Sequence, residues 1–540
     1  MRFTRRRTKR NAVVDQHHKF SESTICDDKM TFDECELAIL RHAVDEAGEK
    51  FKEKIDPTDP TIKKLIEIVE EFIREKKCIC YGGTAINNIL PKQDRFYNYE
   101  EEIPDYDFFT DNALDNAKEL ADRYYEAGFK DVEAKAGVHH GTYKVFVNFI
   151  PMADITYLVP DIYKSMMKEA VKIDGILYAP PNYLRMSMYL ELSRPAGDVS
   201  RWEKVQKRLA LLNKNYPLFA DGCENLIFKE SGKMAHRRDM EEEEVEVHDF
   251  RRGLVNQKNK KKEKEIFETI KSSFIDEGLV FFGGFANAMY ATQSSSTGKK
   301  RWSYVRKIPD FDVLSEEPER SANLLKERLE TIEGLSGKVS IDVFEEVGEI
   351  IAKHYAVSIG KGKNADTVAM IYEPLACHSY NEIDIDGEDH KMKAKIATID
   401  TMLSFYLAFI YAGQKDYEMD RDRILCMAHY LFEVQQKNRL SQKGLLKRFS
   451  TECYGKSPTL MDIRNEKTKK FKELMNKKKT REYEEWFLKY NPSVPGKEKK
   501  DDDEVEDITT PKSITSSTKL TQKKRKPRRK QVAKKMEIYV

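Results

Sequence analysis

The chain has 540 residues and a formal net charge of +2; 34% of its residues are charged and 40% are apolar. A chain of this length does not fold around a single hydrophobic core, so we expect several domains. No apolar run approaches the roughly 20 residues of a membrane span, and no secretory signal is recognisable at the start. The composition favours a soluble, highly charged protein without a membrane segment.

The two ends of the sequence are basic. Six Lys and Arg residues precede the first acid, Asp15, and residues 523–530 are mostly Lys and Arg. Residues 1–30 and 495–540 contain little to bury, so we predict that both are disordered tails. Such tails bind nucleic-acid phosphates, act as a nuclear signal, or remain solvated without one partner, and the sequence leaves these alternatives open.

The eight cysteines are scattered along the chain. The closest pair, Cys78 and Cys80, has a spacing that places both thiols on one face of a strand, which suits a zinc site poorly. We expect the cysteines to be buried and reduced, as in cytosolic proteins.

A candidate phosphate-binding turn lies in the first predicted domain, residues 31–212. A short apolar strand leads into Gly82 and Gly83, and residues 84–90 read as a helix that ends before Pro91. Glycines let the backbone approach a ligand closely, and a helix N-terminus presents free N–H groups to an anion. Taken alone, a Gly-Gly pair is more often only a turn.

Three aspartates follow in apolar surroundings. Asp105 and Asp107 are two residues apart in the stretch 103–109, so both side chains project from one face of a strand. Asp154 lies in the apolar run 145–159, which we predict to be a strand, and an acid there is costly unless it is paired or bound to a metal. Carboxylates on rigid strands suit Mg²⁺ or Mn²⁺. Two glycines, a D-x-D pair and a later lone Asp are typical of polymerase-β-like nucleotidyltransferases.

A basic stripe follows the third aspartate. We predict a helix that begins with a capping box at Ser200 and Glu203 and continues to residue 212. One stripe of this helix carries Arg201, Lys204, Lys207 and Arg208. These side chains would bind a triphosphate or the RNA backbone, or they form an ordinary solvated face; the pattern supports both interpretations.

The second half of the sequence repeats the motifs of the first. Gly283 and Gly284 follow an apolar strand, and Asp310 and Asp312 form a second D-x-D pair. The interval from the second glycine to the first aspartate is 26 residues (284 to 310), against 22 in the first copy (83 to 105). Such a repeat indicates an internal duplication of roughly 200 residues per copy.

The second copy lacks the third acid. The position that matches Asp154 is Val368 or Met370, depending on the alignment gap, and Phe285 replaces Thr84. We therefore expect residues 266–435 to form an inactive domain that helps to build an RNA groove or a dimer surface. Between the copies, residues 213–265 are dominated by charge and read as a linker.

Residues 436–494 are predicted to be a helical C-terminal region. Lysines alternate there with aromatic residues between 464 and 490. Basic residues among aromatics suit single-stranded RNA, but a helix that packs its aromatic side chains on the domain and exposes its lysines is the favoured interpretation.

Four motifs resemble the poly(A) polymerase catalytic subunits of large cytoplasmic DNA viruses, above all those of giant viruses. They are residues 81–87 (YGGTAIN), 103–109 (IPDYDFF), 152–157 (MADITY) and 192–205 (LSRPAGDVSRWEKV). The resemblance covers roughly residues 30–490. It implies that Asp105, Asp107 and Asp154 are catalytic metal ligands.

The resemblance also implies which residues bind the nucleotide and what the protein does. Gly82, Gly83, Thr84 and Asn87 would contact the nucleotide, together with Arg201, Lys204 and Lys207 of the basic stripe. The implied activity is template-independent addition of AMP from ATP to an RNA 3′ end during maturation of viral mRNA. A homodimer in the virion or the host cytoplasm is implied as well.

These patterns predict an α+β fold of two tandem nucleotidyltransferase-like lobes, each a mixed sheet with flanking helices. Two alternatives to the poly(A) polymerase interpretation remain. One is another RNA terminal nucleotidyltransferase, such as a uridylyl- or CCA-adding enzyme, because the base is not specified by these motifs. The other is a non-catalytic RNA-binding scaffold, against which the intact first set of acids argues.

Overall fold

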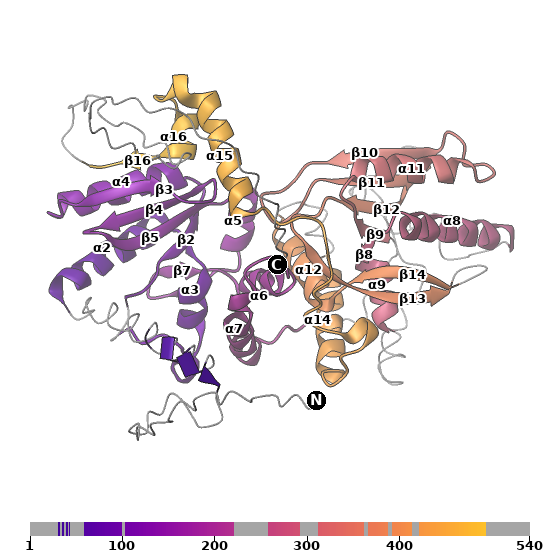
Figure 1. The fold of residues 1–540 in the computed structure, drawn as a ribbon, viewed down its shortest axis with the longest axis horizontal. Helices are drawn as coiled ribbons and strands as arrows, with labels where there is room; N and C mark the ends of the chain where they lie inside the picture. Colours follow the sequence, from indigo (N-terminus) through magenta and orange to yellow (C-terminus); the bar gives the residue numbers. More distant parts are fainter. Residues whose placement is uncertain are drawn as a thin grey trace, which may run out of the picture. The chain divides into compact units, whose positions relative to one another are not determined.

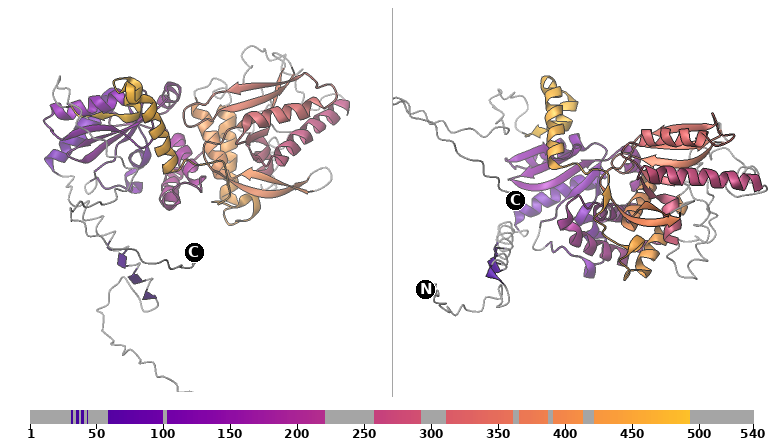
Figure 2. Two further views of the ribbon diagram at one scale, coloured as in Figure 1. Left: turned by 45° about the horizontal axis from the view of Figure 1, so that its top comes forward. Right: turned by 45° about the vertical axis from the view of Figure 1, so that its right-hand side comes forward.

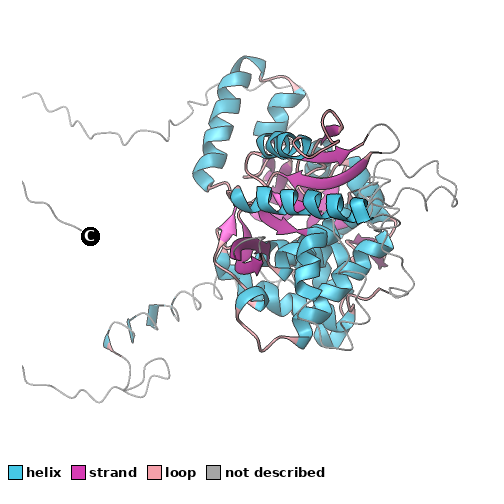
Figure 3. Ribbon diagram, turned by 90° about the vertical axis from the view of Figure 1, so that its right-hand side faces the viewer, coloured by secondary structure: helices cyan, strands magenta, loops and turns pink. Residues whose placement is uncertain are grey.

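The computed structural model describes residues 59–99, 103–220, 257–291, 311–360, 365–386, 391–412 and 421–492, with a few positions between 31 and 43. These residues form two mixed β-sheets that are flanked by helices (Figures 1 and 3), which confirms the predicted fold class. The predicted tails and most of the predicted linker lie outside the described residues. No helix in the described ranges is long and apolar enough to cross a membrane.

The first sheet has eight strands in the order β16-β3-β4-β5-β2-β1-β7-β6. The strands are β1 (Ile79–Cys80), β2 (Asp107–Thr110), β3 (Val132–Ala136), β4 (Thr142–Val147), β5 (Ile150–Tyr157), β6 (Val171–Ile173), β7 (Ile176–Tyr178) and β16 (Lys489–Tyr490). The helices of this half are α2 (Pro60–Lys76), α3 (Gly82–Ile89), α4 (Ala113–Glu126), α5 (Pro160–Met167), α6 (Pro181–Leu192) and α7 (Trp202–Asn215).

Helix α2 shows how local sequence builds one layer of this lobe. Asp59 caps the helix, because its side chain accepts a hydrogen bond of 2.6 Å from the backbone N–H of Thr61. The apolar side chains of α2 recur at helical spacing, and Val69 and Phe72 are fully buried. Their burial fixes α2 against the sheet that carries the candidate site.

The predicted strand 145–159 is two antiparallel strands, β4 and β5. A tight turn joins them, and Asn148 and Phe149 adopt positive φ angles of 49° and 65° there. Phe149 is 88% exposed at this turn. The turn was not predicted because the run is apolar throughout: the strands before and after the turn bury the same kinds of side chain.

The second sheet has the order β10-β11-β12-β9-β8-β14-β13-β15. Its strands are β8 (Val280–Phe282), β9 (Phe311–Leu314), β10 (Val339–Phe344), β11 (His354–Ile359), β12 (Asp366–Tyr372), β13 (His378–Asp386), β14 (Lys391–Ala397) and β15 (Cys453–Tyr454). Its helices are α8 (Gln257–Asp276), α9 (Gly283–Ala291), α11 (Pro318–Glu330), α12 (Ile399–Tyr411) and α14 (Arg421–Lys437).

The two sheets share one topology. The path β3-β4-β5-β2-β1-β7-β6 in the first sheet matches β10-β11-β12-β9-β8-β14-β13 in the second, with the same sequence of antiparallel and parallel pairs. The structure therefore supports the duplication that was inferred from the repeated motifs.

The boundaries of the predicted linker and C-terminal region differ from those drawn from composition. Helix α8 starts within the predicted linker, and its Ile270 and Phe274 side chains are buried in the second core. At the other end, β15 joins the second sheet, whereas β16 pairs with β3 of the first. The helices between them, α15 (Leu460–Leu474) and α16 (Arg481–Phe487), lie against the first lobe (yellow in Figure 2). Residues 436–494 thus complete both lobes.

The aromatic side chains of this C-terminal region pack among themselves. Phe487 lies 5.5 Å from Phe471 and 5.2 Å from Tyr483 between ring centroids, and Trp486 lies 4.1 Å from His140 of the first lobe. The favoured interpretation, packed aromatic side chains with exposed lysines, agrees with these contacts.

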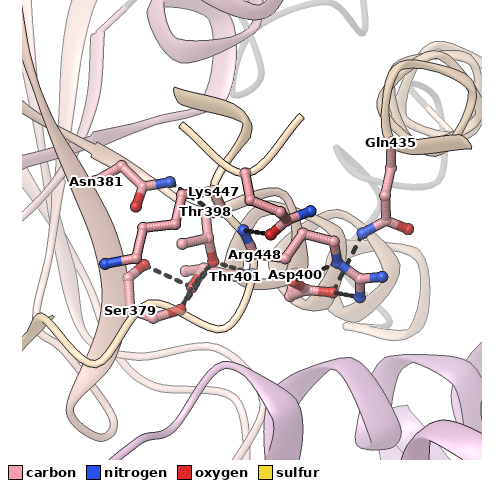
Figure 4. A network of polar contacts seen from close by, with 9 residues as sticks. Ser379, Asn381, Thr398, Asp400, Thr401, Gln435, Lys447 and Arg448 are labelled. Carbon is pink, nitrogen blue, oxygen red and sulfur yellow. Dashed lines mark hydrogen bonds and ion pairs between the residues drawn. The ribbon is translucent and has the colours of Figure 1, made fainter. Parts of the chain in front are cut away.

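A buried polar network surrounds the start of α12 (Figure 4). Asp400 is only 2% exposed, and its carboxylate accepts hydrogen bonds from Arg448 (2.7 Å) and Gln435 (3.3 Å). The hydroxyls of Ser379 and Thr398 lie 2.8 Å apart beside it. Because a buried charge requires a partner, this network ties α12 to α14 and to the loop before β15.

The cysteines correct one expectation. Cys377 and Cys453 form a disulfide with a Cα–Cα distance of 5.2 Å, because β15 pairs with β13. Cys35 and Cys426 each take part in a disulfide as well. Cys78 and Cys80 are free and buried, as expected.

Candidate active site

Two of the predicted catalytic aspartates lie opposite each other. Strands β2 and β5 are parallel, and their register places Asp107 directly across from Asp154. The backbone N–H of Asp154 donates a 3.0 Å hydrogen bond to the carbonyl of Tyr106, which locks this register. Asp105 precedes β2 by two residues, and the intervening Tyr106 is buried. The alternation brings the three carboxylates to one face.

The three carboxylates repel one another. Burial, followed by the charges of Asp105 and Asp154, raises the pKa of Asp107 to about 7. Burial, followed by the charge of Asp154, also raises the pKa of Asp105. Such a cluster is ionised most readily when a cation shares it. The carboxylate oxygens are the donors that a hard divalent ion prefers, although no three His, Cys, Asp or Glu side chains in the described ranges are placed to hold a metal ion as they stand.

The glycine turn packs directly on these acids. Gly82 has a φ of +71°, and a Cβ atom added there would lie 2.7 Å from Oδ2 of Asp107. A Cβ added to Gly83 would lie 2.6 Å from the hydroxyl of Tyr97. Glycine at these two positions therefore lets the N-terminus of α3 approach Asp107 and Tyr97 without displacing their side chains.

Thr84 supports the site from beneath. Its side chain is 3% exposed, and its hydroxyl donates a 2.7 Å hydrogen bond to the backbone carbonyl of Asp105. The hydroxyl proton is thus used within the protein, and the contact of Thr84 with the nucleotide stays a prediction. Thr84 holds the backbone of Asp105.

Asn87 has a different place from the one predicted. It is fully buried, and its Oδ1 accepts hydrogen bonds of 2.8 Å from the N–H groups of Phe96 and Tyr97. Its amide nitrogen donates to Tyr99 and to Asn88. The side chain therefore holds the 96–99 loop next to the glycine turn and is not presented to a nucleotide.

The basic helix α7 starts at Trp202, one residue later than predicted. Ser200 does not cap it; Asp198 instead accepts hydrogen bonds from the backbone and hydroxyl of Ser200 and caps a short 3₁₀ turn (Val199–Arg201). The capping-box prediction was wrong, because the chain enters α7 from this turn.

The predicted basic residues of α7 divide into two groups. Arg201 pairs with Glu191 at 3.0 Å, and its charge also lowers the pKa of Asp107. The charge of Lys204 lowers the pKa of Asp105, so both cations lie near the acids. Lys207 is 73% exposed and pairs with Glu203. Among the three basic residues of α7 that were predicted to bind the nucleotide, Lys207 is therefore the one for which the described residues show no interaction with the acids.

Arg208, a member of the stripe not assigned to the nucleotide, lies closest to the glycine turn. One guanidinium nitrogen would be 3.0 Å from a Cβ added to Gly83, and the group donates a 2.5 Å hydrogen bond to the hydroxyl of Tyr97. The guanidinium also lies over the ring of Phe96, 4.8 Å from its centroid. Arg208 is thus held rigidly at the position where a phosphate would meet the turn.

Lys144 of β4 is the site residue that sequence reasoning missed. It lies directly across from Asp154 on the antiparallel neighbour strand, and its ammonium forms an ion pair with that carboxylate. Its charge also lowers the pKa of Asp105 and of Asp107. The alternation of apolar and polar residues in 142–147 shows that Lys144 faces away from the core, but it does not identify the partner.

Residues 67–198 match a family model described as poly(A) polymerase catalytic subunit. The matched segment contains the glycine turn and all three aspartates. The chain resembles the poly(A) polymerase catalytic subunits of large DNA viruses.

Two relatives carry the same resemblance. A candidate poly(A) polymerase catalytic subunit of Acanthamoeba polyphaga mimivirus is 31% identical over 186 residues, which cover 33% of this chain and 31% of the relative. Its counterpart in African swine fever virus (strain Badajoz 1971 Vero-adapted) is 36% identical over 163 residues, which cover 29% and 34%. The matches thus span about a third of the length of these relatives.

The likeness of fold extends much further than the likeness of sequence. The crystal structure of the Megavirus polyadenylate synthase superposes with a TM-score of 0.64 and covers 88% of both chains at 19% identity. The two proteins therefore share their two-lobed fold.

The second lobe preserves the framework of the site without its chemistry. A β-bulge lies at the same place in both sheets, after Val145 on β4 and after Val357 on β11. Strand β12 pairs with β9 in a register that places Met370 opposite Asp312. Met370, and not Val368, is therefore the residue that matches Asp154. Asp310 lies outside the described residues.

The glycine turn of the second lobe is closed by apolar packing. Phe285, at the position of Thr84, is 2% exposed, and its ring lies 4.8 Å from Phe281 and 5.2 Å from Phe311. A Cβ at Gly283 would lie 1.8 Å from Oδ2 of Asp312. The space beside the turn is filled by protein.

Proposed function

We propose that this protein is a template-independent poly(A) polymerase that adds AMP from ATP to RNA 3′ ends, and that its first lobe is the catalytic one. The observation that carries the proposal is the register of Asp107 with Asp154 beside the Gly82–Gly83 turn. This constellation lies within the segment that matches the poly(A) polymerase family model.

Asp105, Asp107 and Asp154 would hold Mg²⁺ or Mn²⁺ in this function. Bound there, such ions would activate the attacking 3′ hydroxyl and neutralise the triphosphate during in-line displacement of pyrophosphate. The acids fit this role because burial and neighbouring carboxylates raise the pKa of Asp105 and Asp107, and a bound cation would offset this effect.

The remaining residues of the site would bind and orient the nucleotide. The N–H groups at the start of α3 point a positive dipole end at the position next to Asp107. Arg208, which Tyr97 and Phe96 hold in place, would bind a phosphate oxygen at this turn. Arg201 and Lys204 add positive charge near the acids.

The second lobe has a structural part in this proposal. The loss of the third acid at Met370 and the packing of Phe285 leave no complete centre among its described residues. We assign it to support of the first lobe and to an RNA-binding or dimer surface. The homodimer and the viral and host-cytoplasmic location, which the resemblance suggested, are part of the proposal.

The decisive experiment is extension of a labelled short RNA with each nucleoside triphosphate in turn, with Mg²⁺ or Mn²⁺. We expect long tails from ATP alone, and none from the Asp105→Ala/Asp107→Ala variant. Equal use of UTP would contradict the proposed specificity for ATP but would agree with nucleotidyl transfer as the reaction. Absence of extension by folded protein with every triphosphate would overturn the proposal and favour the scaffold.

A further inference from the structure

Lys144 belongs to a row of charged side chains that crosses three strands. The register of β2, β5 and β4 places Asp107, Asp154 and Lys144 side by side on one face of the sheet. Lys144 gains this place from the β-bulge after Val145, which shifts the pairing of β4 and β5 by one residue. If β4 and β5 paired without the bulge, starting from the turn that joins them, Ala153 would lie opposite Lys144.

The ammonium of Lys144 serves all three carboxylates of the site. It forms an ion pair with Oδ2 of Asp154, and the two side chains are 37% and 22% exposed. Among the positive charges near Asp105 and Asp107, that of Lys144 lowers their pKa values most. One flexible ammonium therefore supplies the charge that a divalent cation would supply to the same oxygens.

The second lobe shows that the lysine and the acid go together. Its equivalent bulge aligns Ala356 of β11 with Lys144 and Met370 of β12 with Asp154, and these two residues face each other across the strands. The charged pair of one lobe is an apolar pair in the other. A lysine kept only for sheet stability or solubility would have no reason to be absent together with the acid.

A neighbouring lysine provides an internal contrast. Lys135 of β3 lies directly across from Lys144 in the same row. Its ammonium pairs with Glu133 at 3.2 Å and lies over the ring of Phe146. Lys135 thus carries the same charge one strand further from the acids, with partners of its own.

We propose that Lys144 is the resident counter-ion of the carboxylate centre, and that a divalent cation loads the centre by displacing its ammonium from Asp154. This inference rests on the proposed function. It means that metal affinity is set by competition with a side chain of the protein. The released ammonium, on a flexible stem beside the site, is then available to an anionic substrate group.

The test is direct titration of Mn²⁺ into the full-length protein without RNA or nucleotide, followed by the electron paramagnetic resonance signal of the free ion. We expect Lys144→Met to bind Mn²⁺ about threefold to tenfold more tightly than the unmodified protein, because the competing charge is gone. Lys135→Met is the matched control and should change the affinity by less than about twofold. Asp154→Asn should lose the Mn²⁺ that binds at this centre.

Two results would overturn the inference, and they differ from failure of the proposed function. Equal affinity in Lys144→Met and the unmodified protein, with weaker binding in Asp154→Asn, would show that the lysine does not compete. Equal tightening in Lys135→Met would show that only general charge matters. A protein that shows the predicted Mn²⁺ affinities but does not extend RNA would refute the polymerase proposal and keep the counter-ion exchange.

Discussion

Met370 lies directly opposite Asp312 on the parallel strands β12 and β9. The same position in the first lobe is held by an acid opposite an acid. A methionine supplies a thioether in place of a carboxylate, and a thioether is a poor ligand for Mg²⁺. The two lobes therefore have one framework and different chemical capacities, and this difference is open to direct test.

We expect Asp107→Asn to reduce AMP addition by at least about 10²-fold, and Asp312→Asn to change it by less than about twofold. The reason is that only Asp107 faces a second acid across the strands. Initial rates of RNA extension, measured for both variants beside their denaturant unfolding curves, check the prediction. A large loss in Asp312→Asn with unchanged stability would assign a catalytic part to the second lobe.

Gly82→Ala should abolish activity, because the new methyl group would meet Oδ2 of Asp107 at 2.7 Å. Gly128 is the matched control: its φ is +102°, and nothing lies within 4 Å of a Cβ added there. Both substitutions strain the backbone by about 1 kcal/mol. We expect similar losses of unfolding free energy in the two variants but loss of RNA extension only in Gly82→Ala. Full activity of Gly82→Ala would show that the catalytic function of Asp107 does not require a glycine at this turn.

Thr84→Val removes the hydroxyl that donates to the carbonyl of Asp105 and keeps the shape of the side chain. We expect the unfolding free energy to fall by about 1 kcal/mol and the extension rate to fall with it, because Asp105 loses its support. Thr84→Ser, which retains the donor, should stay closer to the unmodified protein. If the hydroxyl bound the nucleotide instead, the half-saturating ATP concentration would rise without loss of stability.

Arg448→Ala should lower the unfolding free energy by about 3 kcal/mol, because Asp400 would remain buried with only Gln435 as a charge-neutral partner. The Arg320–Glu317 pair on α11 is the control, since the two side chains are 70% and 65% exposed. Arg320→Ala should therefore have no measurable effect in the same denaturant titration. Equal effects would mean that the network of Figure 4 does not hold the second lobe together.

His378 should make the protein sensitive to acid. It is fully buried, neither ring nitrogen has a hydrogen-bond partner in the described part of the chain, and burial, with the charge of Arg194, lowers its pKa to about 3. The unfolded chain binds a proton at His378 below its ordinary pKa of 6.5, whereas the folded chain does not. This contribution to stability is therefore complete above about pH 6.5 and is lost as the pH falls toward about 3.

The substitution His378→Leu removes this titration. Its unfolding free energy should depend less steeply on pH between about 6.5 and 4 than that of the unmodified protein. Urea unfolding at a series of pH values measures the two slopes. Parallel slopes would mean that the imidazole is protonated in the folded state.

The spacing of residues along the chain identified those parts of the site whose geometry depends only on residues close by in the sequence. Gly82 and Gly83 indicate a close approach of the backbone to another group, because they have no side chain. Asp105 and Asp107 share a face because strand residues alternate. The duplicated motifs indicated two lobes of the same fold. These inferences need only the geometry of a strand or turn, which sequence determines over a few residues.

Only the tertiary structure decided which residues from different strands meet. The bulge after Val145 sets Lys144 against Asp154, its counterpart sets Ala356 against Met370, and the pairing of β12 with β9 sets Met370 against Asp312. A shift of one residue changes every partner along a strand pair, and it depends on packing across the whole sheet. For the same reason the hydrogen bonds of Thr84 and Asn87 within the protein were not predicted: composition shows that a group can form hydrogen bonds, and only the fold shows which part of the chain uses them.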